Sequence, residues 1–328
     1  MNKDRLNRGH SSAQINGKIP GRKKKTFLKQ VQLELYKNWG VYLLLLPAFV
    51  WVIIFCYIPM YGVVIAFKDF NPIYGILRSP WAGFKHFERF LGSYDFIRLI
   101  SNTLTLSIYQ LVAGFPIPII FALCLNYISN NKLRKTVQTV SYAPHFISTV
   151  VIVGMMSVFL SPSKGLVNIL LGFIGVEPIS FMGRPDLFKH LYVWSGIWQE
   201  TGWSGIIYIA SLANISPELH EAAVIDGATK LKRIWYVDIP GIMPTAIILL
   251  IMRTGQIMGI GFEKAFLMQN NLNLVKSEII STYVYKVGLL GAQFSFSAAV
   301  GLFNSVVSMV LLLSVNYIAR KRAEISLI

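Results

Sequence analysis

The sequence is poor in charged residues and nearly free of cysteine. Only 14% of its 328 residues are charged, whereas 54% are hydrophobic; soluble domains carry about 25% charged residues. This shortage of charge argues against a large soluble core and indicates a polytopic membrane protein, because each spanning helix needs about 20 mostly apolar residues. Cys56 and Cys124 lie inside apolar runs, so neither a disulfide framework nor a metal site is predicted.

Motifs for nucleotide binding and catalysis are also missing. The sequence has no G-x-x-x-x-G-K-[ST] loop, so we do not expect this chain to bind ATP in that way. Its five histidines are scattered, and it has neither H-E-x-x-H nor G-x-S-x-G. The start of the chain lacks an early apolar segment and does not resemble a cleaved signal peptide. We therefore predict a protein that is not an enzyme and holds no cofactor itself.

Six apolar segments predict an all-α fold with six membrane-spanning helices. The fourth and fifth segments are the least regular, because Glu200 and Arg253 interrupt them. The six are expected at about residues 41–67, within 99–128, within 136–161, at about 191–213, at about 239–260 and within 291–318.

The distribution of Lys and Arg predicts the orientation in the membrane. One side of the membrane would hold 19 of the 31 basic residues, and ten of these lie in the N-terminal tail, residues 1–38. The other side would hold 11, and Arg253 lies inside a span. By the positive-inside rule both termini are expected in the cytoplasm. The net charge of +16 then reflects topology and attraction to anionic membrane lipid, and no nucleic-acid motif accompanies it.

A charged loop at about residues 214–240 separates the fourth and fifth segments. Ser216 is a good N-cap and Pro217 suits the first helical position. Glu218 and Glu221 follow in the first turns, where the helix dipole favours negative charge. Gly227 is expected to end this helix, and Asp226 or Thr229 could cap a second one. The local chemistry alone leaves two alternatives open, a helix lying on the lipid surface and a docking element for a cytoplasmic partner.

The same loop resembles the EAA loop of ABC-importer permeases. The matching positions are Glu221, Ala222, Ala223, Asp226, Gly227, Ala228, Val237, Ile239 and Pro240. The resemblance implies that the first short helix docks in a cleft of an ATPase subunit. Glu221 would be its polar anchor, Ala222 and Ala223 its close-contact face, and Gly227 the bend between the two helices. Glu218, Asp226, Ala228 and Pro240 would complete this coupling site.

Other segments resemble the permease subfamily for oligosaccharides and polysaccharide fragments, related to lipoprotein-B-type and alginate or pectin-fragment permeases. They include SYAPHFISTVVIVGMM, SGIWQETGWSGIIYIASL and GFEKAFLMQN, and the resemblance runs from about residue 35 to the end. It implies a type I ABC importer permease fold over residues 39–328, in a bacterial cytoplasmic membrane. The implied partners are a second permease, two ATPase subunits that bind ATP and Mg²⁺, an extracellular solute-binding protein and an oligosaccharide. The alternative is a stand-alone secondary transporter or channel, for which the sequence offers no internal repeat and a single intramembrane carboxylate, Glu200.

Polar and aromatic side chains within the spans are candidates for the substrate path. They are Trp194, Trp198, Gln199, Glu200, Trp203, Arg253, Gln256 and Asn304. Structural alternatives remain for most of them. The tryptophans could form an interfacial belt, Glu200 could pair with Arg253, and Asn304 could join two helices. His145 could be a packed, hydrogen-bonded histidine. If Arg253 faces the path, an anionic sugar such as a uronate is favoured.

Overall fold

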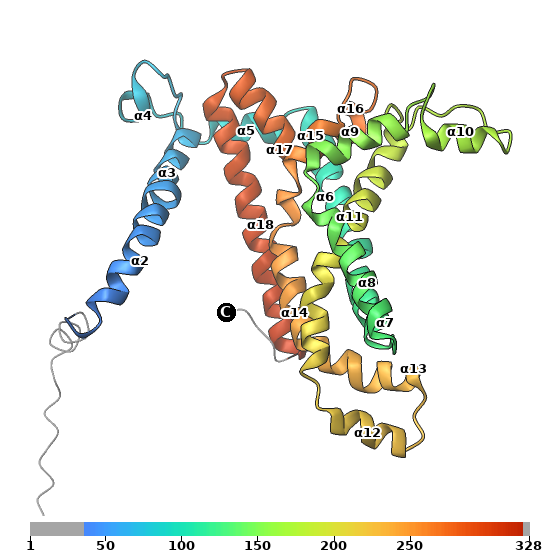
Figure 1. Cartoon of the computed structure of the whole chain (residues 1–328). Helices are drawn as coiled ribbons and strands as arrows, with labels where there is room; N and C mark the ends of the chain where they lie inside the picture. The colour runs from blue at the N-terminus through green and yellow to red at the C-terminus, as the bar shows by residue number, and fades with distance from the viewer. Residues whose placement is uncertain (1–35, 324–328) are drawn as a thin grey trace, which may run out of the picture. The chain divides into compact units, whose positions relative to one another are not determined.

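The computed structural model describes residues 36–323, which are almost entirely helical (Figure 1). Within this part of the chain no strand forms, and the one β-bridge joins Lys68 and Trp81. The predicted all-α fold is confirmed. The contacts divide the chain into two parts, residues 1–61 and residues 62–328. Most of the predicted basic tail lies outside the described residues.

The first part contains one apolar helical segment. It consists of α2 (Trp39–Val52), a π-helical turn (Ile53–Tyr57) and α3 (Ile58–Met60). A 3₁₀ segment, Tyr61–Phe67, continues it across the division between the two parts. Together Trp39–Phe67 is long and apolar enough to cross a membrane, in agreement with the first predicted span. The segment is uncharged throughout, as expected for a helix surrounded by lipid.

Three further segments, all in residues 62–328, meet the same requirement for a span. The first combines α6 (Asp95–Gly114) and α7 (Pro116–Asn126). The second combines α13 (Lys230–Arg233), a π-helical turn (Ile234–Asp238) and α14 (Ile239–Gly255). The third is α18 (Phe294–Ala323). These correspond to the second, fifth and sixth predicted spans.

The third predicted span is sharply broken rather than straight. It consists of α8 (Asn131–Tyr142), a 3₁₀ turn (Ala143–Phe146) and α9 (Thr149–Phe159), with a bend of 97° between the two halves. Pro144 lies in the break, where its ring disfavours continuation of α8. Ser148 then caps α9, because its Oγ accepts a hydrogen bond from the backbone N–H of Val151 at 3.4 Å.

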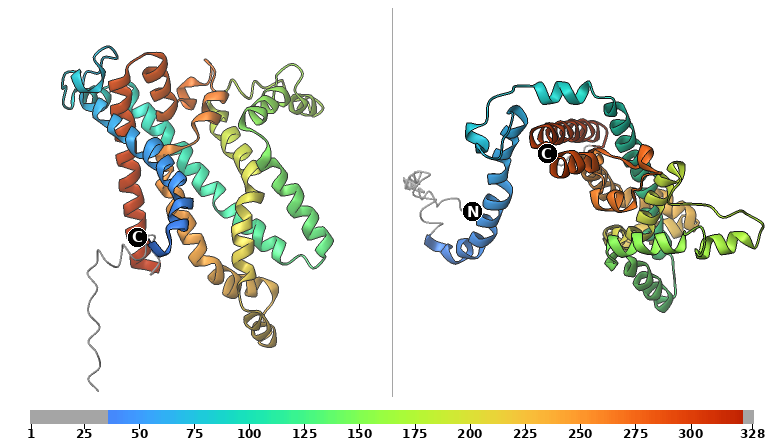
Figure 2. Two further views of the ribbon diagram at one scale, coloured as in Figure 1. Left: turned by 60° about the vertical axis from the view of Figure 1, so that its left-hand side comes forward. Right: turned by 90° about the horizontal axis from the view of Figure 1, so that it is seen from above.

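The fourth predicted span corresponds to α11 (Pro185–Ala213), which lies at the centre of the second part of the chain. Its 29 residues extend over about 43 Å, which exceeds the thickness of a hydrocarbon core. It packs against α6, α7, α8 and α14, and α14 packs in turn against α18 (Figures 1 and 2).

Four segments and the bent pair qualify as spans in residues 36–323 by length and composition. The helix α11 is not among these five. The total of six spans requires α11 to cross the membrane as well, and it stays a prediction.

Short helices lie at the two ends of this bundle. At one end α12 (Pro217–Ile225) projects beside α13, and we call this the α12 end (Figure 1). The opposite end, the α15 end, carries α15 (Phe262–Met268). The remaining short helices are α4 (Gly75–Arg78), α5 (Lys85–Leu91), α10 (Leu166–Gly172), α16 (Leu274–Ser277), α17 (Ile280–Val284), and the π- and 3₁₀-helical turns Tyr285–Leu290 and Ile257–Gly259.

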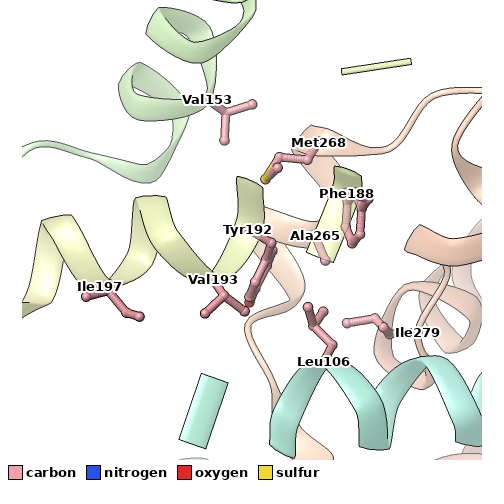
Figure 3. Packing of buried hydrophobic residues seen from close by; sticks show 9 residues of the cluster. All are labelled: Leu106, Val153, Phe188, Tyr192, Val193, Ile197, Ala265, Met268 and Ile279. Atoms are coloured by element: carbon pink, nitrogen blue, oxygen red, sulfur yellow. The ribbon is translucent and has the colours of Figure 1, made fainter. Parts of the chain in front are cut away.

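A buried apolar cluster joins α11 to its neighbours near the α15 end (Figure 3). Tyr192 and Val193 of α11 pack with Leu106 of α6 and Met268 of α15. Each of these side chains is at least 95% buried. Two further clusters stabilise α18 against α6, and α11 against α7 and α14. These contacts fix α11 in place, and α11 supplies most of the polar residues discussed below.

We expect Gly202→Val to prevent normal packing of α11 against α8. A Cβ atom at Gly202 would lie 2.1 Å from the backbone oxygen of Ser141, so the two helices would have to separate. Overpacking of this kind costs about 1–3 kcal/mol or more. The thermal unfolding midpoint of the detergent-purified protein should fall by several degrees. Gly301→Ala is the matched control, because nothing lies within 4 Å of a Cβ there. An unchanged midpoint in Gly202→Val would contradict the packing described here.

Candidate coupling loop and polar cavity

The loop at the α12 end folds as two short helices. The Ser216 Oγ accepts a hydrogen bond from the N–H of Glu218 at 3.3 Å at the start of α12. At the end of α12, Gly227 adopts a φ of 74°, a region that favours glycine. The N–H of Ala228 then donates to the carbonyl of Ala223 at 2.8 Å, which closes the helix end. The predicted bend at Gly227 is confirmed.

The second helix of the loop, α13, begins at a threonine cap. The Thr229 Oγ1 accepts a hydrogen bond from the N–H of Lys232 at 3.4 Å. Of the two caps considered from the sequence, Thr229 is therefore the one used, and Asp226 instead forms the C-cap of α12.

The surface of α12 is open to solvent. None of its residues is buried, and the side chains of Glu218, Glu221 and Ala222 are exposed. Val224 and Ile225 are 55% and 85% exposed although both are apolar. A projecting helix with exposed apolar and acidic side chains is typical of a protein-interaction surface.

One residue of the loop that the sequence did not single out is fully buried. Asp238 is 0% exposed, and its Oδ2 accepts a hydrogen bond from the Tyr127 hydroxyl at 2.7 Å. The Nε2 of His220, on α12, lies 3.4 Å from the Asp238 Oδ1. Burial and the neighbouring Asp238 carboxylate raise the pKa of Tyr127 to about 12. Asp238 thus joins α12 to the end of α7. The sequence signal that could have identified Asp238 is a single acidic residue inside the apolar run YVDIPG.

A polar cavity of about 330 Å³ lies among α6, α7, α11 and α14. Three predicted path residues line it, namely Glu200, Arg253 and Gln256. Hydroxyl and amide groups that the sequence analysis did not select lie in the same wall: Ser107, Gln110, Thr201 and Ser204. The cavity therefore offers one anionic, one cationic and several neutral hydrogen-bonding groups, which suits a polyhydroxylated ligand.

The two charges of the cavity have separate partners. An Nη of Arg253 donates to the Ser204 Oγ at 3.1 Å, and the Oε2 of Glu200 lies 3.1 Å from the Nδ1 of His145. Within residues 36–323, Glu200 and Arg253 do not form the ion pair considered from the sequence. Arg253 has no acidic partner in that range, so its charge is available at the cavity wall.

The other predicted path residues lie elsewhere. Trp194 and Trp198 line a separate apolar cavity with His190, and the Trp194 Nε1 donates to the Tyr109 hydroxyl at 2.9 Å. Trp203 stacks on the His145 ring, with centroids 4.4 Å apart and planes within 2°.

Two predicted path residues serve as links between chain segments. The Gln199 Nε2 donates to the carbonyl of Ile147 at 3.0 Å, at the break before α9. The Asn304 Nδ2 donates to the carbonyl of Met258 at 3.0 Å. The alternative of an interhelical link therefore describes Asn304 in this structure, and neither residue lines the polar cavity.

Helices long enough to span a membrane, a polar cavity between them and a projecting helix pair define a polytopic membrane protein of the permease class. Residues 114–324 match the family described as "Binding-protein-dependent transport system inner membrane component", and the chain belongs to this family. It is therefore a permease of the ABC-importer type, and the resemblance inferred from the EAA loop is confirmed. A partner permease and ATPase subunits are typical of the family.

Individual relatives cover nearly the whole chain. Protein LplB of Bacillus subtilis (strain 168) is 43% identical over 287 residues, 88% of this chain and 90% of LplB. The polygalacturonan/rhamnogalacturonan transport system permease protein YteP of the same organism is 41% identical over 301 residues, 92% of this chain and 94% of YteP. A chain of the crystal structure of a bacterial alginate ABC transporter, in complex with an alginate pentasaccharide-bound periplasmic protein, is 39% identical. It superimposes with a TM-score of 0.84, covering 91% of this chain and all of the other.

Proposed function

We propose that this chain is the permease subunit of an ABC importer for oligosaccharides, and that its substrates are fragments of acidic polysaccharides. The observation that carries the acidic substrate is Arg253, a cation at the wall of the polar cavity with no acidic partner among residues 36–323. An unpaired cation inside a membrane protein is costly and commonly serves a function. Two of the relatives described above handle polygalacturonan or alginate, which are polyuronates.

The proposed mechanism is alternating access driven by separate ATPase subunits. This chain would bind neither ATP nor Mg²⁺ and would hydrolyse nothing. Closure of the ATPases would move α12, held by Glu221 and the Ala222–Ala223 face, and the movement would rock the spans around the cavity. An extracellular binding protein would deliver the sugar. Both chain termini would lie in the cytoplasm of a bacterium, as the distribution of Lys and Arg predicts.

Arg253→Gln tests the acidic substrate. We expect uptake of a trisaccharide of uronates to fall about tenfold or more, since a hydrogen bond to a charged group contributes about 1.5–3 kcal/mol. Uptake of the same trisaccharide with its carboxyl groups reduced to alcohols should change little. The measurement is ATP-driven uptake into proteoliposomes that hold the complete importer, with its binding protein. Each variant is compared with the wild type for the same sugar.

Arg253→Lys is the control that keeps the positive charge, and it should retain most uptake of the acidic sugar. Equal loss of both sugars in Arg253→Gln, or loss of neither, would remove the argument for an acidic substrate.

A further inference from the structure

A second cation, Lys264, is buried beside the polar cavity. It lies on α15, and the residue is 9% exposed. Its Nζ donates to the carbonyl of Tyr192 at 3.0 Å and lies 5.0 Å from the centroid of the Tyr192 ring. In the part of the chain that the structure describes, Lys264 forms no ion pair. Burying an ammonium group without a carboxylate partner is expensive.

The ammonium group lies directly behind a gap in the cavity wall that is left by a glycine. A Cβ atom at Gly196 would lie 3.2 Å from the Lys264 Nζ and 3.9 Å from the Gln110 Nε2. Both Gly196 and Gln110 line the cavity. Any larger residue at position 196 would stand between the ammonium group and the cavity. The Oε1 of Gln110 is itself buried without a hydrogen-bond partner.

Lys264 and Arg253 approach α11 at different heights. Lys264 lies beside Gly196, and Arg253 binds the Ser204 hydroxyl two turns further along the same helix. Eight residues of α-helix correspond to about 12 Å, a distance greater than one sugar ring. Glu200 lies midway between them and is engaged by His145. Two separated positive charges therefore lie along α11, that of Arg253 in the cavity wall and that of Lys264 directly behind it at Gly196.

The charge state of Lys264 depends on what binds near it. Burial lowers the pKa of Lys264 to about 8, and the carboxylate of Glu200 acts in the opposite direction. The ring of Tyr192, on α11, also packs against the ammonium group. A ligand carboxylate beside the ammonium would favour its protonated form.

We propose that Lys264, acting through the gap at Gly196, is a second carboxylate-binding group of the path, so that the cavity selects oligosaccharides with carboxylates on more than one ring. This inference rests on the proposed function, because it assumes that acidic sugars pass through this cavity. It assigns Lys264 a different carboxylate of the substrate from the one bound by Arg253.

The test compares Lys264→Met and Lys264→Arg in the complete importer in proteoliposomes. The probes are a uronate trisaccharide with all its carboxylates and the same sugar with a single carboxylate left. We expect Lys264→Met to raise the apparent KM for the fully acidic probe about tenfold and to leave the singly acidic probe within twofold. Lys264→Arg should retain the wild-type preference. Raising the pH from 7 to 9 should lower uptake of the fully acidic probe by the wild type but not by Lys264→Arg.

Gly196→Ala provides a second variant that keeps the lysine. The added methyl group should push the ammonium away from the cavity and raise the KM for the fully acidic probe several-fold. If Lys264→Met does not fold, as judged by its thermal unfolding midpoint, Gly196→Ala decides the question. Equal effects on both probes, or on neither, would overturn the role of Lys264. A wild type that does not distinguish acidic from reduced sugars would instead overturn the proposed function.

Discussion

Glu221→Arg is expected to reduce ATP-driven uptake by about a hundredfold while leaving the permease folded. Glu221 is exposed on α12, and within residues 36–323 it takes part in no ion pair, so the change breaks no ion pair there. In the proposed assembly the same position would be enclosed by an ATPase subunit. A reversed charge in an enclosed interface costs about 2–5 kcal/mol, which corresponds to a loss of about 30-fold to several thousandfold in affinity.

Three measurements on the Glu221→Arg importer separate coupling from folding. Co-purification of the ATPase subunits reports assembly, ATP hydrolysis stimulated by the loaded binding protein reports coupling, and the thermal unfolding midpoint of the permease reports folding. Glu177→Arg is a matched control, because Glu177 is also exposed but lies outside α12 and α13. It should leave all three measurements unchanged. Normal uptake by Glu221→Arg would show that α12 is not the coupling element.

The sequence was most informative where the structure is decided locally. The caps of α12 and α13 depend on side chains within a few residues of the backbone groups they bind. The bend at Gly227 depends on a φ that favours glycine. Because none of this needs distant contacts, the two short helices could be predicted with their residues. The uncharged spans were predictable for a similar reason, since length and apolarity alone define them.

The break between α8 and α9 could be predicted only in part. Pro144 signals a possible interruption, but prolines also occur inside spanning helices, as Pro47 does in α2. The direction of the chain after the break depends on a contact with α11, where Gln199 binds the carbonyl of Ile147. A contact between residues 52 positions apart leaves no pattern in one sequence.

The substrate-path prediction grouped residues of α11 by chemical type rather than by helix face. Residues four apart share a face, and the cavity is lined by Gly196, Glu200 and Ser204. Trp194 and Trp198 share a different face, which lines the apolar cavity. Sorting the residues of α11 by helix face would have separated Glu200 from Trp194 and Trp198. It would also have added Ser204 to the predicted path residues. Lys264 could not be found in this way, because its position beside Gly196 depends on how α15 packs against α11.

Asp238→Ala is expected to uncouple the importer without preventing its assembly. The change leaves the half-buried Tyr127 hydroxyl without its acceptor and leaves His220 without its carboxylate partner. The loss of a hydrogen bond to a buried carboxylate costs about 1–3 kcal/mol. Since α12 is held to the end of α7 through Asp238, movement of α12 should be transmitted poorly to the spans. We expect ATP hydrolysis to persist while the amount of sugar imported per ATP falls about tenfold.

The interaction between Asp238 and Tyr127 can be measured by a double-mutant cycle. Tyr127→Phe alone removes the hydroxyl and should lower import per ATP by a smaller factor than Asp238→Ala. If the two residues act through their hydrogen bond of 2.7 Å, the double variant should lose little more than Asp238→Ala alone, because interacting residues are not additive. Asp238→Asn keeps the shape and an acceptor for Tyr127, so it isolates the contribution of the charge near His220. Additive effects in the cycle, or an unchanged ratio of import to ATP hydrolysis in Asp238→Ala, would show that α12 transmits its movement by another route.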